Sequence, residues 1–144
     1  MTDDKRCFVD TNVFLAATDR DRPDHTHAID FLESGLRGEA RLFANGQVFR
    51  EYLVVATRPV PDNGLGLTAS DALSNLQAFA QGVQLLEENQ AVSRQLQRLV
   101  EKFEVSGKRI HDANIVATMR ENGLAQLKTF NQDDFSDFPD IDFA

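Results

Sequence analysis

The fold is decided by the stretch Cys7-Phe8-Val9-Asp10-Thr11-Asn12-Val13-Phe14-Leu15-Ala16-Ala17 near the start of the chain. Its first apolar residues predict a short buried strand over 7–10, and the apolar residues that follow recur at helical spacing. Asp10 would then stand at the carboxyl end of a strand, the edge at which ligands bind in open parallel sheets. Asp10 could equally cap the following helix by accepting backbone N–H bonds. A functional role for Asp10 at this edge requires other carboxylates at the same edge.

Composition predicts one globular domain over residues 1–144. Hydrophobic residues make up 42% of the chain and charged residues 26%, as is typical of globular proteins. The net charge of −8 argues against binding nucleic acid through a uniformly positive surface. It leaves local binding open, because divalent cations held by converging acids would reverse the sign of the field at one site.

The sequence gives no indication of a membrane span or a signal peptide, and we expect a cytoplasmic protein. The longest apolar runs, such as 52–56, are far shorter than the ~18 residues that a spanning helix needs. The single cysteine, Cys7, lies in the apolar strand and is expected to be a core residue rather than a reactive thiol. No Cys/His zinc pattern occurs.

Strand and helix patterns alternate along the chain. Further strands are expected over 41–44, 83–86 and 126–129, with a short fifth over 141–143; helices are expected over 25–37, from Asn45 to before Pro59, from Thr68, and over 91–103 and 110–122. This alternation predicts an α/β fold, a three-layer α/β/α sandwich around a mostly parallel sheet of four to five strands.

Glu51 is the second candidate acid. It lies inside the helix that ends before Pro59, on one stripe with Gln47 and Arg58 and with apolar neighbours on both sides. A lone helical Glu is more often an ordinary solvated residue, but the surrounding apolar density favours a partly buried one.

Asp112 is the third candidate, because it shares a helix face with Ile115, Val116 and Met119. A carboxylate on a buried stripe is costly unless it is paired or bound to a metal. The alternative explanation is that Asp112 lies in the first helical turn, where a negative charge interacts favourably with the helix dipole. His111 lies about 100° around the helix from Asp112, so it is expected to flank the site or contact substrate.

The fourth position is open between Asn131 and Asp134, which follow the strand that ends near Thr129. Turn formation explains Asn and Asp there equally well. Oxygen donors without nearby cysteine favour Mg²⁺ or Mn²⁺ over zinc. Metals held by carboxylates suit phosphoryl chemistry.

At these residues the sequence resembles the PIN-domain family, and especially the VapC-like toxins of type II toxin–antitoxin pairs. The likeness spans nearly the whole chain, through Val9-Asp10-Thr11-Asn12-Val13, Arg50-Glu51-Tyr52, His111-Asp112-Ala113 and Thr129-Phe130-Asn131 with Asp134-Phe135. Each piece is short, but their order and spacing together are fairly specific.

The resemblance implies a metal-dependent endoribonuclease that hydrolyses RNA phosphodiesters with metal-activated water. Asp10, Glu51 and Asp112 would coordinate the metal, supported by Thr11 or Asn12. Family members often carry a fourth acid where this chain has Asn131, and Asp134 is the candidate to compensate. The family also implies a homodimer held inactive by a VapB-like antitoxin that inserts an apolar segment and a basic side chain into the acidic site. Candidate contacts to the RNA backbone are Arg50, Arg58, Lys108 and Arg109.

Two other hypotheses remain. A PIN scaffold could bind RNA or a protein partner without cutting, because the fourth ligand is weak. A haloacid-dehalogenase-type phosphatase also begins with an Asp after the first strand, but it requires Asp-x-Asp where this chain has Asn12, and no convincing phosphate-binding lysine segment follows.

Overall fold

The computed structural model describes residues 5–144, so residues 1–4 of the expected single domain lie outside it. Its centre is a five-stranded sheet of order β3-β2-β1-β4-β5 in which every neighbouring pair is parallel. The strands are β1 (Arg6–Val9), β2 (Arg41–Asn45), β3 (Val83–Leu86), β4 (Gln126–Lys128) and β5 (Asp142–Phe143). The predicted parallel sheet is therefore confirmed, at the upper end of the expected strand number.

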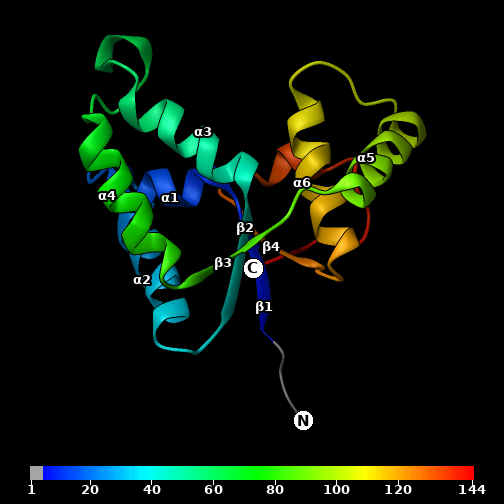
Figure 1. Cartoon of the computed structure of the whole chain (residues 1–144), viewed down its shortest axis with the longest axis horizontal. Helices are drawn as coiled ribbons and strands as arrows, with labels where there is room; N and C mark the ends of the chain where they lie inside the picture. The colour runs from blue at the N-terminus through cyan, green and yellow to red at the C-terminus, as the bar shows by residue number, and fades with distance from the viewer. Residues whose placement is uncertain (1–4) are drawn as a thin grey trace.

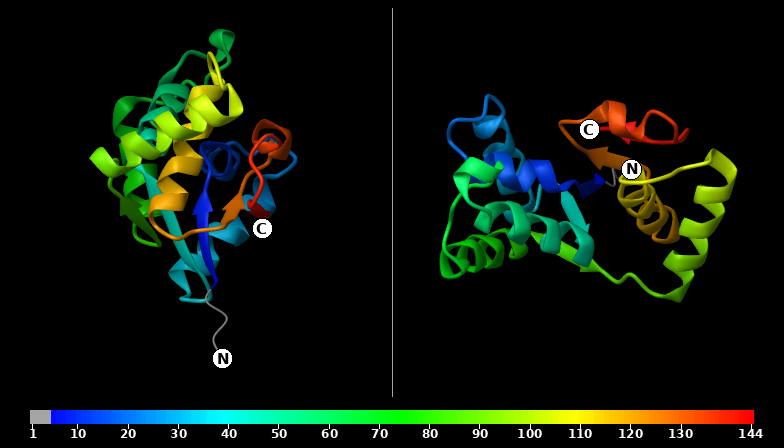
Figure 2. Two further views of the ribbon diagram at one scale, coloured as in Figure 1. Left: turned by 90° about the vertical axis from the view of Figure 1, so that its right-hand side faces the viewer. Right: turned by 90° about the horizontal axis from the view of Figure 1, so that it is seen from above.

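Helices cover both faces of the sheet. They are α1 (Thr11–Thr18), α2 (His25–Leu36), α3 (Gly46–Thr57), α4 (Ala69–Ala80), α5 (Gln90–Phe103) and α6 (Arg109–Glu121), with short 3-10 turns η1 (Val60–Asp62) and η2 (Gln132–Phe135). Helices α1 to α4 lie on one side, and α5 and α6 pack together on the other (Figures 1 and 2). The three-layer α/β/α arrangement is thus confirmed.

The central strand β1 lies between two neighbours, with Phe8 opposite Phe43 on one side and Leu127 on the other. Phe8 and Val9 are completely buried, which explains why this strand is a continuous apolar run. Cys7 is buried as predicted, and burial raises the pKa of its thiol to about 12. No helix within residues 5–144 is long and apolar enough to span a membrane.

Local side-chain bonds set the helix starts that the sequence predicted. The Asn45 side chain accepts the Val48 N–H at 3.0 Å, and Thr68 accepts the Asp71 N–H at 3.1 Å. The strand that ends near Thr129 stops one residue earlier, at Lys128, and η2 was not expected at all. Thr129 is consequently the first residue beyond the sheet edge.

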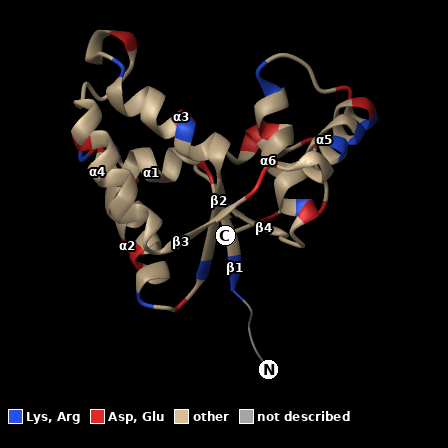
Figure 3. Ribbon diagram, viewed as in Figure 1, with Lys and Arg blue, Asp and Glu red and all other residues tan. Residues whose placement is uncertain are grey.

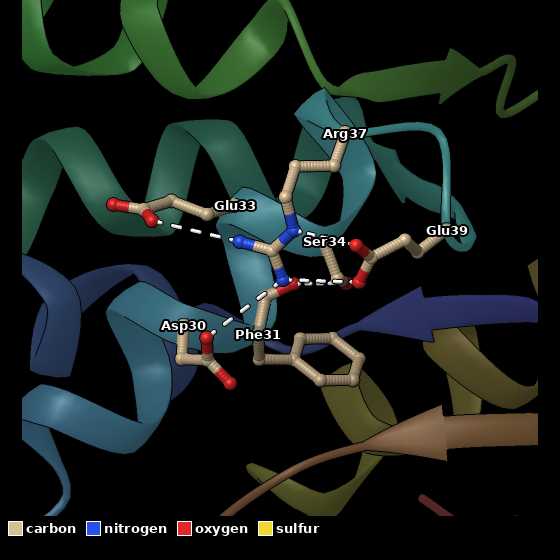
Figure 4. Close-up of polar contacts among 6 residues, drawn as sticks. All are labelled: Asp30, Phe31, Glu33, Ser34, Arg37 and Glu39. Atoms are coloured by element: carbon tan, nitrogen blue, oxygen red, sulfur yellow. Dashed lines mark hydrogen bonds and ion pairs between the residues drawn. The ribbon is translucent and has the colours of Figure 1, made fainter.

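The connection from α2 to β2 is closed by an exposed ion-pair cluster around Arg37 (Figure 4). The guanidinium pairs with Glu39 at 2.8 Å and lies 3.7 Å from both Asp30 and Glu33. Exposed pairs of this kind contribute little to stability. The cluster therefore links residues of α2 to Glu39 in the connection that follows.

Candidate active site

The candidate site lies where the strand order reverses, because β1 connects through helices to β2 on one side and pairs with β4 on the other. Ligands of open parallel sheets bind outside the carboxyl ends of strands at such a switch point. Asp10 directly follows β1, and its N–H donates to the Lys128 carbonyl at the end of β4 at 3.0 Å. The carboxyl ends of both strands therefore meet at Asp10.

Both oxygens of the buried Asp10 carboxylate are held by hydrogen bonds. Its Oδ1 accepts the Thr11 N–H at 2.8 Å, while its Oδ2 accepts the Thr129 hydroxyl at 2.9 Å and the Asn12 amide at 3.4 Å. Asn12 also accepts the Phe130 N–H at 3.1 Å, which ties the start of α1 to the chain after β4. Asp10 thus caps α1 and is fixed at the sheet edge at the same time.

Glu51 reaches the same edge from α3. The Thr11 hydroxyl donates to its Oε1 at 2.9 Å, and the Gln47 amide lies 3.3 Å from its Oε2. Thr11 therefore connects the two acids, because its backbone N–H binds Asp10 and its side chain binds Glu51. From the sequence we expected Thr11 only to support Asp10. In the structure Thr11 does so by bridging Asp10 and Glu51.

Asp112 lies in the first turn of α6, and the neighbours that share its face are buried as predicted. Asp112 itself is half-buried. Burial first, and then the negative charges of Asp134, Asp10 and Glu51, raise the pKa of its carboxyl to about 7, against a smaller lowering by Arg109. The acids predicted from distant segments are therefore close enough to act on one another.

The charge of Asp134 acts on both Asp10 and Asp112, so Asp134 lies near these two acids. Burial raises the pKa of Asp10 to about 6; the bonds from Thr129 and Thr11 oppose the rise, and the charges of Glu51 and Asp134 add to it. Acidic residues gather where α3 and α6 approach each other (Figure 3). We call Asp10, Glu51, Asp112 and Asp134 the acid cluster.

Asn131, the other candidate for the fourth position, contributes differently. Its backbone N–H donates to the Thr129 hydroxyl at 3.0 Å, and its side chain is exposed. It therefore helps to fix Thr129, which in turn holds Asp10.

The acid cluster suits a hard divalent cation in donor type and in charge. Its donors are all oxygens, and the neighbouring negative charges that help to raise the pKa of Asp10 and Asp112 would be compensated by a positive ion. Within residues 5–144, however, no three His, Cys, Asp or Glu side chains are arranged so that they could hold one ion. The side chains must move toward one another to close around a metal.

The predicted substrate contacts fall into two groups. Arg50 and Arg58 line a hollow of about 390 Å³ beside Thr11 and Glu51. Lys108 and Arg109 lie at the start of α6, where Arg109 forms an ion pair with Asp137. The His111 side chain is exposed, and its backbone carbonyl accepts a bond from Gln47 at 2.9 Å.

Two residues of the site were not identified as functional from the sequence. Thr129 was noted as a strand end and as part of a stretch that resembles the family, with no role of its own, and Gln47 only as a neighbour of Glu51 on its helix stripe. A polar residue one turn before an acid on an otherwise apolar stripe was the available signal for Gln47. Nothing in the local sequence distinguishes Thr129 from other residues after a strand.

The fold and this site define the class of protein. Residues 7–142 match the PIN domain family, and the chain belongs to that family.

Its relatives include ribonucleases of the VapC group, which confirms the resemblance found in the sequence. Ribonuclease VapC24 of Mycobacterium tuberculosis (strain ATCC 25618 / H37Rv) is 31% identical over 137 residues, covering 90% of this chain and 89% of the relative. Ribonuclease VapC23 of the same strain is 31% identical over 124 residues, covering 86% of this chain and 91% of the relative.

Solved structures share the fold. The structure of VapBC2 from Rickettsia felis bound to a promoter DNA fragment includes a chain that matches with a TM-score of 0.71 and 13% identity, covering 96% of this chain and 97% of that chain. VapC20 of Mycobacterium tuberculosis, described as a sarcin-ricin loop cleaving toxin, matches with a TM-score of 0.67 and 19% identity, over 90% and 93%. Membership of the PIN family removes the haloacid-dehalogenase hypothesis, and Asn12 is occupied in holding Asp10 and Phe130.

Proposed function

We propose that the protein is an Mg²⁺- or Mn²⁺-dependent endoribonuclease, the toxin of a toxin–antitoxin pair. The observation that carries this proposal is that Thr11 bridges Asp10 and Glu51 at the sheet edge of a PIN-family chain, while the charges of Glu51 and Asp134 act on both Asp10 and Asp112. The similarity to proteins named as VapC ribonucleases supports RNA as the substrate.

The residues of the chain have distinct tasks in this proposal. Asp10, Glu51 and Asp112 would hold the ion, with Asp134 as the fourth acid. When bound, the ion supplies positive charge for the phosphate and lowers the pKa of an attacking water. Thr129 and Asn12 keep Asp10 in place.

Phosphate binding is assigned to the hollow beside Glu51. Arg50 and Arg58 line it together with Thr11, Val54 and Val55. Arginine binds phosphate oxygens well because its planar fork matches their geometry. RNA seated there would present a phosphodiester to the acid cluster, although the chain as a whole is acidic.

We further propose a VapB-like antitoxin partner and a homodimer. The acid cluster, in which neighbouring negative charges help to raise the pKa of Asp10 and Asp112, is also a favourable place for a basic side chain of a partner. Several solved structures that share the fold are described as toxin–antitoxin or VapBC assemblies. Light scattering on the purified chain, alone and with its partner, tests both assemblies.

The direct test is RNA cleavage by protein freed of any partner. We expect cleavage in Mg²⁺ or Mn²⁺, none in EDTA, and loss of cleavage in Asp10→Asn and Glu51→Gln. Glu101→Gln, on the exposed face of α5, is the matched control and should cleave like the parent. Parent protein that cleaves no RNA with either ion, or Asp10→Asn that cleaves as well as the parent, would disprove the proposal.

A scaffold that binds RNA or protein without cutting is the second candidate. It is favoured by one observation, that no three acidic side chains within residues 5–144 are arranged to hold an ion. Calorimetric titration with Mn²⁺ separates the two. Saturable binding that is lost in Asp112→Asn supports the nuclease, and absence of binding supports the scaffold.

A further inference from the structure

We infer that Gln47 is a positioning residue that sets Glu51 against the start of α6, so that Glu51 and Asp112 can serve one ion. This inference rests on the proposed function. It assigns a role to a buried side chain that neither coordinates the ion nor touches the substrate.

Gln47 uses both ends of its amide in the contact between α3 and α6. Its side chain is 2% exposed. Its Nε2 donates to the His111 carbonyl at 2.9 Å and lies 3.3 Å from Glu51 Oε2, while its Oε1 accepts the Asn114 amide at 2.6 Å. The orientation of the amide is determined by these partners, because a carboxylate and a carbonyl can only accept. Gln47 therefore connects Glu51 to the residue that precedes Asp112.

A second set of bonds holds Gln47 from outside the acid cluster. Glu88, in the loop between β3 and α5, accepts the Gln47 backbone N–H on Oε2 at 2.7 Å and the Asn114 amide on Oε1 at 2.8 Å. Asn114 in turn donates to Gln47 Oε1. Gln47, Asn114 and Glu88 thus form a closed ring of hydrogen bonds that joins three segments of the chain.

This ring has a consequence for the acids on either side of it. Glu51 has its other oxygen bound by Thr11, so its carboxylate is held from both sides. Asp112 follows the carbonyl that Gln47 binds, so the same amide fixes the backbone next to it. Groups that orient metal ligands in this way are typically worth about 10- to 100-fold in metal affinity or activity.

The test replaces Gln47 by methionine, which has a similar length and shape but no hydrogen bonds to give. We expect the dissociation constant for Mn²⁺, measured by calorimetry, to rise by about 10- to 100-fold in Gln47→Met. The turnover number for RNA should fall while KM stays near the parent value. Gln97→Met, the same change at an exposed site on α5, is the control and should change none of these quantities.

Folding is checked by urea unfolding of each variant. If Gln47→Met does not fold, Asn114→Ala and Glu88→Ala remove the outer bonds of the ring, and we expect weaker Mn²⁺ binding in the same direction. Asn114 is only partly buried and Glu88 is exposed, so neither change leaves a large cavity.

The outcomes distinguish this inference from the function on which it rests. Parent protein that binds Mn²⁺ and cleaves RNA, with folded variants of the ring that do both equally well, would overturn the positioning role and leave the nuclease intact. Parent protein that neither binds Mn²⁺ nor cleaves RNA would remove the nuclease, and the positioning role with it.

Discussion

The acid cluster makes the metal-free protein less stable as the pH rises, and the Asp10 carboxyl gives the size of this effect. Its pKa is raised from 3.8 to about 6, with burial as the main cause. One pKa unit corresponds to about 1.4 kcal/mol, so ionising Asp10 in the folded protein costs about 3 kcal/mol relative to the unfolded chain. The pKa of Asp112 is raised as well, but this residue is only half-buried, so solvent screening reduces its contribution to the pH dependence of stability.

The sign follows from proton binding. Between about pH 4 and pH 7 the folded state holds more protons than the unfolded state, so the free energy of unfolding falls as the pH rises through this range. This loss of stability is complete above the pKa of Asp10 in the folded state and absent below its pKa in the unfolded state. In Asp10→Asn the contribution disappears, because the amide does not ionise while its Oδ1 can still accept the Thr11 N–H.

The measurement is urea unfolding in EDTA, followed by circular dichroism at several pH values from 4 to 8 for the parent and Asp10→Asn. The quantity to compare is the difference in unfolding free energy between them, because it cancels the titrating groups that do not interact with Asp10. We expect the parent to lose about 3 kcal/mol relative to the variant across this range. A difference that stays constant, or that changes in the opposite direction, would refute the electrostatic account of the site.

Three further predictions concern other parts of the molecule. In an Asp10→Asn background that cannot cut, changing Arg50 and Arg58 to Gln should weaken RNA binding measured by filter binding. The slope of log affinity against log salt concentration should become shallower by about 1.4, as expected for two lost contacts to a single strand. An unchanged slope would show that neither residue contacts RNA. Asn45→Ala should lower the unfolding free energy by about 2 kcal/mol, because the completely buried amide caps α3, and urea unfolding that matches the parent would contradict this. Cys7 should resist a thiol reagent at pH 8 in the folded protein and react on unfolding, since burial raises its pKa to about 12; rapid labelling of the native state would show that the strand is open.

The sheet and its helices could be predicted because each element carries its own signal. Residues 83–86 form β3 as expected, and α2 begins at His25 as expected. Apart from the unexpected η2, the differences described here are at element ends, where a strand stopped at Lys128 and a helix began at Arg109. Ends are set by hydrogen bonds to distant residues, which a local pattern does not contain.

The choice between Asn131 and Asp134 could not be made from the sequence for a physical reason. Both residues suit a turn, and the short 3-10 helix that follows Asn131 and contains Asp134 has no apolar period to reveal it. In the structure the backbone of Asn131 binds Thr129, while the charge of Asp134 acts on Asp10 and Asp112.

The role of Gln47 was inaccessible for a related reason. Its partners His111 and Asn114 are 64 and 67 residues away in the chain, and Glu88 is 41 residues away. Helical spacing placed Gln47 beside Glu51, but only the packing of α3 against α6 shows that its amide joins two acid-bearing elements.

Asp10 illustrates why capping and function need not compete as explanations of one residue. The cap uses one lone pair of Oδ1, and the bonds from Thr129 and Asn12 use Oδ2, so Oδ1 still has a lone pair to offer. These bonds lower the pKa of the carboxyl, yet burial and the neighbouring charges outweigh them. The carboxylate is therefore held in place while its charge stays insufficiently compensated. A position at the end of a buried strand and at the start of a helix produces both properties, which is why Asp10 would meet a positive group at this edge of the sheet as a carboxylate that is already oriented.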